Sequence, residues 1–295
     1  MIKVLLIGGS GFIGKHIIEH FFDSNKYLII APSSKELDAI DEEKVTEYLE
    51  KERFDIVLNF AIYGDGIDKK KDGTKMLEYN LRIFLNFEKN SHLYGKMYYA
   101  GSGAEYDKRY DIVDVTEDDE GKKIPIDQYG LMRYTIDRLI RRSDNIYGLK
   151  IFGIYGIYEQ WQKRFISNCC CKAIKGLPLS IRKNKFFDYL YVKDFCCILE
   201  RLMDIEPIEH AINVVRGEKI DLFSLAKIVL EVSGKELPIY VCEDGMGNEY
   251  TASNNRLIAE IGDFKYTDIK IAIKDMYKWY ADNEWIISMS ELLYQ

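Results

Sequence analysis

The sequence predicts an α/β fold, a doubly wound parallel sheet with a smaller α/β lobe, on three observations. Short β-branched segments in the N-terminal half alternate with segments of helical periodicity, which is typical of right-handed β-α-β units. A glycine-rich turn directly follows the first apolar segment. The length of 295 residues suffices for one large domain with an attached lobe.

Five apolar segments are expected to form strands buried on both faces, because their apolar residues do not alternate with polar ones. Between them, apolar residues recur at helical spacing. After Phe152 this rhythm weakens. We therefore expect a sheet domain over residues 1–152, to which part of 185–215 returns, and a lobe made mainly of 153–295. The five strands are Ile2–Ile7, Tyr27–Ala31, Ile56–Phe60, Met97–Ala100 and Leu149–Phe152, and later helices lie near Phe165–Ile174, Leu222–Val232 and Ile269–Tyr280.

Composition excludes several classes of partner. The chain has 41 Lys and Arg against 48 Asp and Glu, a net charge of −7, so no positive excess indicates a nucleic-acid partner. Apolar runs are too short to span a bilayer and the N-terminus lacks a signal-peptide pattern, which predicts a cytoplasmic protein with no membrane partner. The six cysteines are adjacent or alone and no histidine has ligand spacing, so no metal site is expected.

The first strand runs directly into Gly8-Gly9-Ser10-Gly11-Phe12-Ile13-Gly14, which opens a helical segment. Glycines at 8, 11 and 14 permit a tight turn, close backbone approach and close helix–strand packing, and the helix N-terminus offers its amides to a pyrophosphate. This strand–loop–helix context predicts a dinucleotide site formed by Gly8, Ser10, Gly11, Phe12, Ile13 and Gly14.

The end of the second strand distinguishes the two nicotinamide dinucleotides. NAD sites usually carry an acid there that binds the ribose hydroxyls. Here Ser33, Ser34 and Lys35 occupy the position, and the first acid is Glu36. Hydroxyls and an ammonium suit a 2′-phosphate, which favours NADP(H), with NAD(H) still possible. Alternatively, Ser33 and Ser34 only cap the following turn.

Further motifs follow in order along the chain. Taken together with the glycine loop, they resemble the extended short-chain dehydrogenase/reductase family, in its NAD-dependent epimerase/dehydratase branch of sugar-nucleotide enzymes, over nearly the whole chain. The resemblance implies a Rossmann sheet, a substrate-binding lobe and a nucleotide-sugar substrate. The motifs are Asn59-Phe60-Ala61, Asn80, Ser102-Gly103-Ala104-Glu105-Tyr106, Tyr129-Gly130-Leu131-Met132-Arg133, Ile154-Tyr155-Gly156, Asp188-Tyr189-Leu190-Tyr191-Val192-Lys193-Asp194 and Ile212-Asn213-Val214.

The resemblance implies catalytic roles for Ser102, Tyr129 and Arg133. Reduction of a ketone needs a proton for the developing alkoxide, and a tyrosine supplies it if a cation one helical turn away lowers its pKa. Ser102 would hydrogen-bond the same substrate oxygen. Arg133 departs from the family's Lys, and its larger planar fork is not equivalent to an ammonium. Two interpretations of Arg133 remain open: a working site with altered geometry, or a site whose activity is slowed or lost. The resemblance also places Phe60, Ala61, Asn80, Tyr129, Arg133 and Phe152 at the cofactor.

The residues after Ser102 narrow the reaction. Gly103 and Ala104 stand where a 4,6-dehydratase of this family carries an acid pair, and Ala104 and Arg164 where a fucose-synthase-like enzyme carries Cys and His. This favours NADPH-dependent reduction of a 4-keto nucleotide-linked deoxysugar. A nucleotide-sugar 4-epimerase and a non-catalytic dinucleotide-binding sensor remain alternatives.

Basic residues are expected to bind the substrate diphosphate. Arg164 and Arg182, with Lys183 and Lys185, could form such a clamp, although a solvated charged face explains them equally well. The resemblance adds Asp188 to the substrate residues. It also implies a homodimer that pairs through the helices around Leu77–Phe87 and Tyr129–Ile140.

Overall fold

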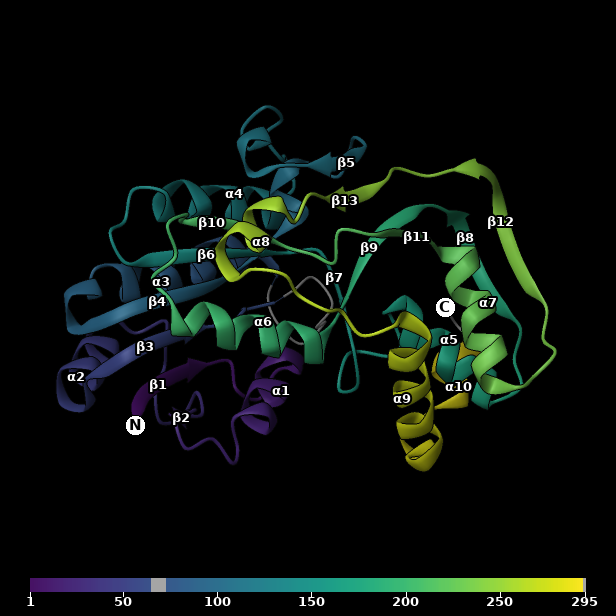
Figure 1. Cartoon of the computed structure of the whole chain (residues 1–295), viewed down its shortest axis with the longest axis horizontal. Coiled ribbons are helices and arrows are strands. Elements are labelled where there is room, and N and C mark those ends of the chain that lie inside the picture. Colours follow the sequence, from purple (N-terminus) through teal and green to yellow (C-terminus); the bar gives the residue numbers. More distant parts are fainter. Residues whose placement is uncertain (65–72, 294–295) are drawn as a thin grey trace.

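The computed structural model describes residues 1–64 and 73–293. Its main sheet has six strands in the order β10-β6-β4-β3-β1-β2, and every neighbouring pair is parallel. This confirms the doubly wound parallel α/β fold (Figure 1). The strands are β1 Ile2–Ile7, β2 Tyr27–Ile30, β3 Phe54–Asn59, β4 Tyr94–Ser102, β6 Ile146–Ile151 and β10 Ala211–Val214.

Helices cover both faces of this sheet, because successive side chains of a strand point to opposite faces. In β1, Val4 and Leu6 pack with α1 and α6, whereas Leu5 and Ile7 pack with α2, α3 and α4. Both faces therefore have apolar cores. The helices are α1 Phe12–His20, α2 Glu42–Glu52, α3 Met76–Glu88, α4 Gln128–Ile140, α6 Val192–Asp204 and α8 Asn255–Ile261.

The expectation that the second strand is buried on both faces is wrong. β2 lies at one edge of the sheet, and its Leu28 is 44% exposed, whereas β10 at the other edge is buried throughout. An apolar run does not reveal whether other elements cover both faces of a strand, because that depends on topology. The ends of the predicted strands shift by up to three residues, as when Met97–Ala100 becomes Tyr94–Ser102.

The second half builds a lobe around its own apolar core, in which α5, α7 and α9 pack together. A five-stranded sheet in the order β11-β9-β13-β5 joins the lobe to the segment after β4, and β7 also pairs with β9. A two-stranded ribbon, β12 with β8, lies at the far end (Figure 1). The elements are β5 Ile112–Val115, β7 Gly153–Tyr155, α5 Phe165–Ile174, β8 Leu179–Asn184, β9 Phe186–Tyr191, β11 Lys219–Asp221, α7 Leu222–Ser233, β12 Ile239–Met246, β13 Tyr250–Ala252, α9 Ile269–Asp282 and α10 Met289–Leu293.

Two features of the fold position the candidate site. The carboxyl ends of β1, β3, β4 and β6 meet at one edge of the main sheet, and the strand order reverses between β1 and β3, where open α/β sheets bind ligands. The chain also crosses from β9 in the lobe sheet through α6 to β10 in the main sheet, so lobe segments lie beside this edge.

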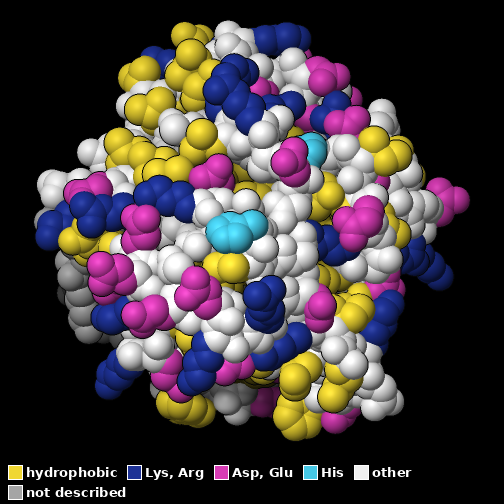
Figure 2. Space-filling model, turned by 90° about the vertical axis from the view of Figure 1, so that its left-hand side faces the viewer, with side chains coloured by type: hydrophobic (Ala, Val, Ile, Leu, Met, Phe, Trp, Pro, Cys, Tyr) yellow, Lys and Arg dark blue, Asp and Glu magenta, His cyan; other side chains and the backbone are white. Residues whose placement is uncertain are grey.

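The surface agrees with the acidic, mixed composition. On the face in Figure 2, described Lys and Arg side chains are interspersed with Asp and Glu. None of the helices in residues 1–64 and 73–293 has the length and apolar character needed to traverse a lipid bilayer.

Candidate active site

The glycine loop is a tightly packed turn between β1 and α1. Gly8 has φ +92°, and a Cβ there would lie 2.7 Å from the carbonyl carbon of Phe60. A Cβ on Gly14 would lie 2.2 Å from the carbonyl oxygen of Gly8, so only glycine fits either position. Ser10 and Gly11 are exposed at the start of α1. The loop therefore presents open backbone at a helix N-terminus, which fits a pyrophosphate.

The loop after β2 differs in one respect from the sequence-based expectation. Ser33, Ser34 and Lys35 are exposed, as a 2′-phosphate site requires. However, the Glu36 carboxylate folds back onto Ser33 and accepts hydrogen bonds from its backbone N–H at 2.7 Å and its hydroxyl at 2.8 Å. These two bonds hold the pKa of Glu36 below its usual value. An ionised acid therefore lies at the position that was expected to lack one.

The side chain of Asn80 is bound to nearby backbone groups, and its expected role at the cofactor stays a prediction. Its side chain donates to the carbonyls of Tyr63 and Met76 at 2.8 and 2.7 Å and accepts the N–H of Tyr63 at 2.8 Å. Asn80 thus fixes the segment that follows β3. Phe60 and Ala61, in that segment, are half-buried beside Gly8.

The structure brings Ser102, Tyr129 and Arg133 together. Ser102 is the last residue of β4, and its hydroxyl accepts the Ala104 N–H at 3.2 Å. Tyr129 and Arg133 lie one turn apart on α4, which begins at the Asp127 cap, and the Arg133 guanidinium carbon is 5.1 Å from the centre of the Tyr129 ring. These three side chains therefore form one cluster at the carboxyl edge of the sheet.

Electrostatics within the cluster favour the phenolate of Tyr129. Burial opposes its ionisation, but the charge of Arg133, hydrogen bonds with Ser102 and Arg133, and the charge of Lys108 together hold the Tyr129 pKa below its ordinary value. Lys108 Nζ lies 5.6 Å from the centre of the Tyr129 ring. Two cations rather than one therefore face this phenol.

Arg133 is held rigidly in place of the family's Lys. Its Nη1 donates to the Tyr99 hydroxyl at 2.8 Å and to the carbonyl of Ala100. Its buried Nε has no hydrogen-bond partner in the described part of the chain, and neither has the side-chain amide of Asn59 at the end of β3. A bound ribose would satisfy the Nε–H of Arg133, so the residues present fit a nicotinamide nucleotide at this edge.

The sequence analysis missed Tyr250, the first residue of β13. It hydrogen-bonds with Ser102, and burial raises its pKa, so the phenol stays protonated. Its ring lies 4.8 Å from Phe152 and 5.6 Å from Phe187. Phe152, expected at the cofactor, also covers Gly103, where a Cβ would lie 2.5 Å from its ring. No local motif marks one tyrosine among 22, because the pairing of β13 with β5 and β9 brings it here.

The expected basic clamp is not assembled. Arg182 is 90% exposed on β8 and pairs with Glu243 of β12 at 2.7 Å. Arg164 is exposed before α5. Lys185 is different: its Nζ lies 4.6 Å from the Phe187 ring, and burial and the nearby charge of Lys108 lower its pKa. Neither Lys108 nor Lys185 forms an ion pair within residues 1–64 and 73–293. Lys185 therefore lies near Lys108, the second cation at the Tyr129 ring.

Asp188 is bound to backbone groups of the turn after β10, and its expected contact with the substrate stays a prediction. Its buried carboxylate accepts the backbone N–H groups of Arg216 at 2.9 Å and Gly217 at 2.7 Å. Burial raises its pKa to about 7, against those hydrogen bonds. Asp188 thus fixes the turn after β10.

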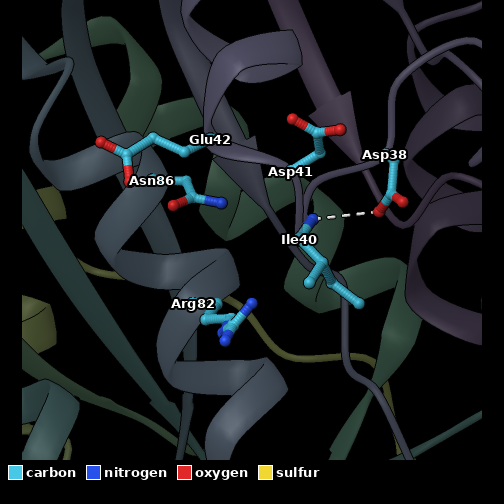
Figure 3. A pocket seen from close by; sticks show the side chains of 6 residues that line it. All are labelled: Asp38, Ile40, Asp41, Glu42, Arg82 and Asn86. Atoms are coloured by element: carbon cyan, nitrogen blue, oxygen red, sulfur yellow. Dashed lines mark hydrogen bonds between the residues drawn. The ribbon is translucent and has the colours of Figure 1, made fainter.

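A surface pocket of about 450 Å³ lies between the segment after β2 and α3 and holds none of the catalytic candidates (Figure 3). Its acids already have partners: Asp38 accepts the N–H of Ile40, Asp41 caps α2 and Glu42 pairs with Lys89. Within the described residues, no group of three or more His, Cys, Asp or Glu could hold a metal ion.

Comparisons with known proteins agree with this geometry. The family described as "NAD dependent epimerase/dehydratase family" matches residues 4–214. The chain is 24% identical to GDP-L-colitose synthase of Yersinia pseudotuberculosis over 96% of this chain and 99% of that protein.

Solved structures show the same fold. One is GDP-mannoheptose C4 reductase from Campylobacter jejuni with NADP bound, at a TM-score of 0.81 and 15% identity over 95% of this chain and 98% of that one. Another is UDP-glucose 4-epimerase from Thermotoga maritima with UDP-glucose, at a TM-score of 0.79 and 17% identity over 96% and 100%. The chain therefore belongs to the NAD-dependent epimerase/dehydratase family, the sugar-nucleotide branch of the extended short-chain dehydrogenases/reductases.

Proposed function

We propose that this enzyme reduces a 4-keto sugar linked to a nucleoside diphosphate, with NADPH as the preferred cofactor and NADH as a possible one. The observation that carries the proposal is the Ser102, Tyr129 and Arg133 cluster beside the glycine loop, in which the Tyr129 pKa is lowered. The similar colitose synthase and heptose reductase, both named for GDP-linked sugars, support it.

When bound, the nicotinamide supplies a hydride, and the residues of this chain handle the oxygen that becomes an alcohol. Tyr129 donates the proton to the developing alkoxide, and Ser102 hydrogen-bonds the same oxygen and orients it. Arg133 and Lys108 stabilise the phenolate that remains. Lys108 lies at the Tyr129 ring and Lys185 lies near Lys108, and these two cations would bind the anionic part of the substrate.

Simple hydride chemistry fits the surroundings of Ser102 better than elimination. Gly103 and Ala104 carry no acid or base. Glu105, the nearest carboxylate along the chain, is buried and ion-paired with Lys150, so it is not available to the substrate. A nucleotide-sugar 4-epimerase would use the same three residues, but would return the hydride and oxidise no NADPH in net terms.

We expect Tyr129→Phe to lower kcat about 100-fold or more, because the proton donor is lost while the ring remains. NADPH binding, followed by cofactor fluorescence, should stay near that of the wild type. Turnover is measured as NADPH oxidation with 4-keto sugars linked to GDP, dTDP, UDP or CDP. Tyr134→Phe, on the same helix, is the control and should be fully active. Wild-type activity in Tyr129→Phe would rule out this proton donor. If the wild-type protein binds NADPH but turns over none of these sugars, the alternative of a non-catalytic dinucleotide-binding sensor is favoured.

We expect Arg133→Met to shift the alkaline limb of the pH–rate profile to higher pH. Reduction needs protonated Tyr129, so the rate falls as pH rises through the Tyr129 pKa, which the charge of Arg133 holds below its ordinary value. Without the charge of Arg133 the Tyr129 pKa rises, and the alkaline limb of the profile moves to higher pH with it. Arg133→Lys keeps the charge and should keep the limb, with equal or higher kcat. If Met and Arg give the same profile, residue 133 does not act electrostatically.

We expect Glu36→Gln to bind NADPH severalfold more tightly relative to NADH. The carboxylate at Ser33 would repel a 2′-phosphate, and the amide keeps the shape without the charge. Fluorescence titration of both cofactors measures the ratio of the two dissociation constants. Glu43→Gln, an exposed acid on α2, is the control. A wild type that binds NADH tenfold more tightly than NADPH would overturn the NADPH preference.

We also propose a homodimer that pairs through α3 and α4. These helices pack against each other, and Leu77, Leu81 and Leu85 of α3 remain only half-buried in the single chain. A charged side chain in that row should prevent close packing of a second copy. Light scattering is expected to show a dimer for the wild type and a monomer for Leu81→Glu. A monomeric wild type would contradict the proposal.

A further inference from the structure

A buried ammonium group lies between two carboxylates next to the catalytic cluster. Lys150, on β6, has a side chain that is 1% exposed. Its Nζ contacts the Glu105 carboxylate and lies 3.0 Å from the Asp137 carboxylate. Both acids are at most 4% exposed, and the Tyr106 ring covers the ammonium at 5.2 Å. None of these charges is accessible to the substrate, so the mechanism above does not use them.

The two carboxylates come from the two segments that carry the catalytic residues. Glu105 follows Ser102 by three residues in the short 3₁₀ helix η3 (Gly103–Tyr106). Asp137 follows Arg133 by four residues and Tyr129 by eight, so all three share one face of α4. Lys150 itself is the register partner of Gly101, the residue before Ser102. The Lys150 ammonium therefore connects β6 with η3, which follows Ser102, and with α4, which carries Tyr129.

A second cation fixes the outer side of this cluster. Arg141 donates through Nε to Asp137 at 2.7 Å, lies 3.4 Å from the Glu120 carboxylate, and donates through Nη2 to the carbonyl of Glu117 at 2.9 Å. Asp137 is thus held by two cations. The buried charge of Glu105 in turn acts on the Arg133 guanidinium, so the cluster is electrostatically connected to the cation beside Tyr129.

Buried ion pairs add little to the free energy of folding, but they restrict the relative positions of the segments that carry them. Removing charges from water costs about as much as their attraction returns, yet loss of one partner leaves an uncompensated buried charge. The three groups must therefore stay in contact, and so must the segments to which they belong. This matters for catalysis, because a displacement of about 1 Å in a reactive group costs about 100-fold in rate.

We propose that the Glu105–Lys150–Asp137 cluster positions Tyr129 and Arg133 against Ser102, with Lys150 as the positioning residue. The proposal rests on the proposed function, because it assigns those three residues to proton transfer. The cluster keeps the phenol and the hydroxyl at the spacing needed to share one substrate oxygen.

The test replaces Lys150 by Met and by Arg. Lys150→Met is expected to lower kcat about 10- to 100-fold with KM and NADPH affinity nearly unchanged, because only the transition-state geometry is lost. Lys150→Arg restores both ion pairs and should recover most of kcat. The matched control is Lys96→Met: Lys96 is also a buried lysine, bound to Glu206 at 2.9 Å and to the carbonyl of Ile205, but near the amino end of β4. It should lose stability and keep kcat.

A second measurement does not depend on turnover. Tyrosinate absorbance of the wild type minus that of Tyr129→Phe reports the ionisation of Tyr129 alone. In Lys150→Met the apparent pKa of Tyr129 should rise, because Glu105 loses its ammonium partner near Arg133 and the contacts of Tyr129 loosen. Arg133, Lys108, Ser102 and Tyr250 face the phenol directly and remain unchanged.

The outcomes separate the two proposals. If the wild type turns over no 4-keto sugar but the Tyr129 titration still shifts in Lys150→Met, the reductase assignment fails and the positioning role stands. If Lys150→Met folds with wild-type kcat and an unshifted titration, the positioning role is overturned. Should Lys150→Met not fold, Glu105→Gln keeps the Lys150–Asp137 pair; a fall in kcat of about tenfold at constant KM supports the role, and wild-type kcat overturns it.

Discussion

The parallel direction of all six main strands is the constraint on which the site depends. It brings the carboxyl ends of β1, β3, β4 and β6 to one edge, so that the glycine loop and Ser102 share it although about 90 residues separate them. Helix α4 then brings Tyr129 and Arg133 to the same edge.

Two cations, Arg133 and Lys108, lie at Tyr129, where the family has the compact ammonium of a Lys. Arg133 is larger than the family's Lys and is held by Tyr99 and the Ala100 carbonyl, while Lys108 approaches the ring from the other segment. Next to them, Lys150 of β6 pairs with Glu105 of η3 and Asp137 of α4. The substitution at 133 is therefore compatible with an ionisable Tyr129, because both its position and its electrostatic environment are supported from other elements.

The lobe contributes two side chains, Tyr250 and Lys185, to the surroundings of the Tyr129 cluster. β13 enters the sheet between β5 and β9, and places Tyr250 against Ser102. Lys185, from the turn between β8 and β9, reaches the same side. Tyr250 and Lys185 thus come from neighbouring strand ends of the lobe, whereas Arg182 on β8 pairs with Glu243 of β12.

The sequence by itself determined the alternation of strands and helices, the glycine loop and the order of Ser102, Tyr129 and Arg133, because these depend on local periodicity, turn chemistry and spacing. It could not show that β2 is an edge strand or that Glu36 folds back onto Ser33. It also could not show that the side chains of Asn80 and Asp188 form hydrogen bonds with backbone groups. Nor could it find Tyr250, Lys108 or Lys150. Only the tertiary structure decided these, because a hydrogen bond or ion pair between residues far apart in the chain depends on strand pairing and burial, which no local pattern records.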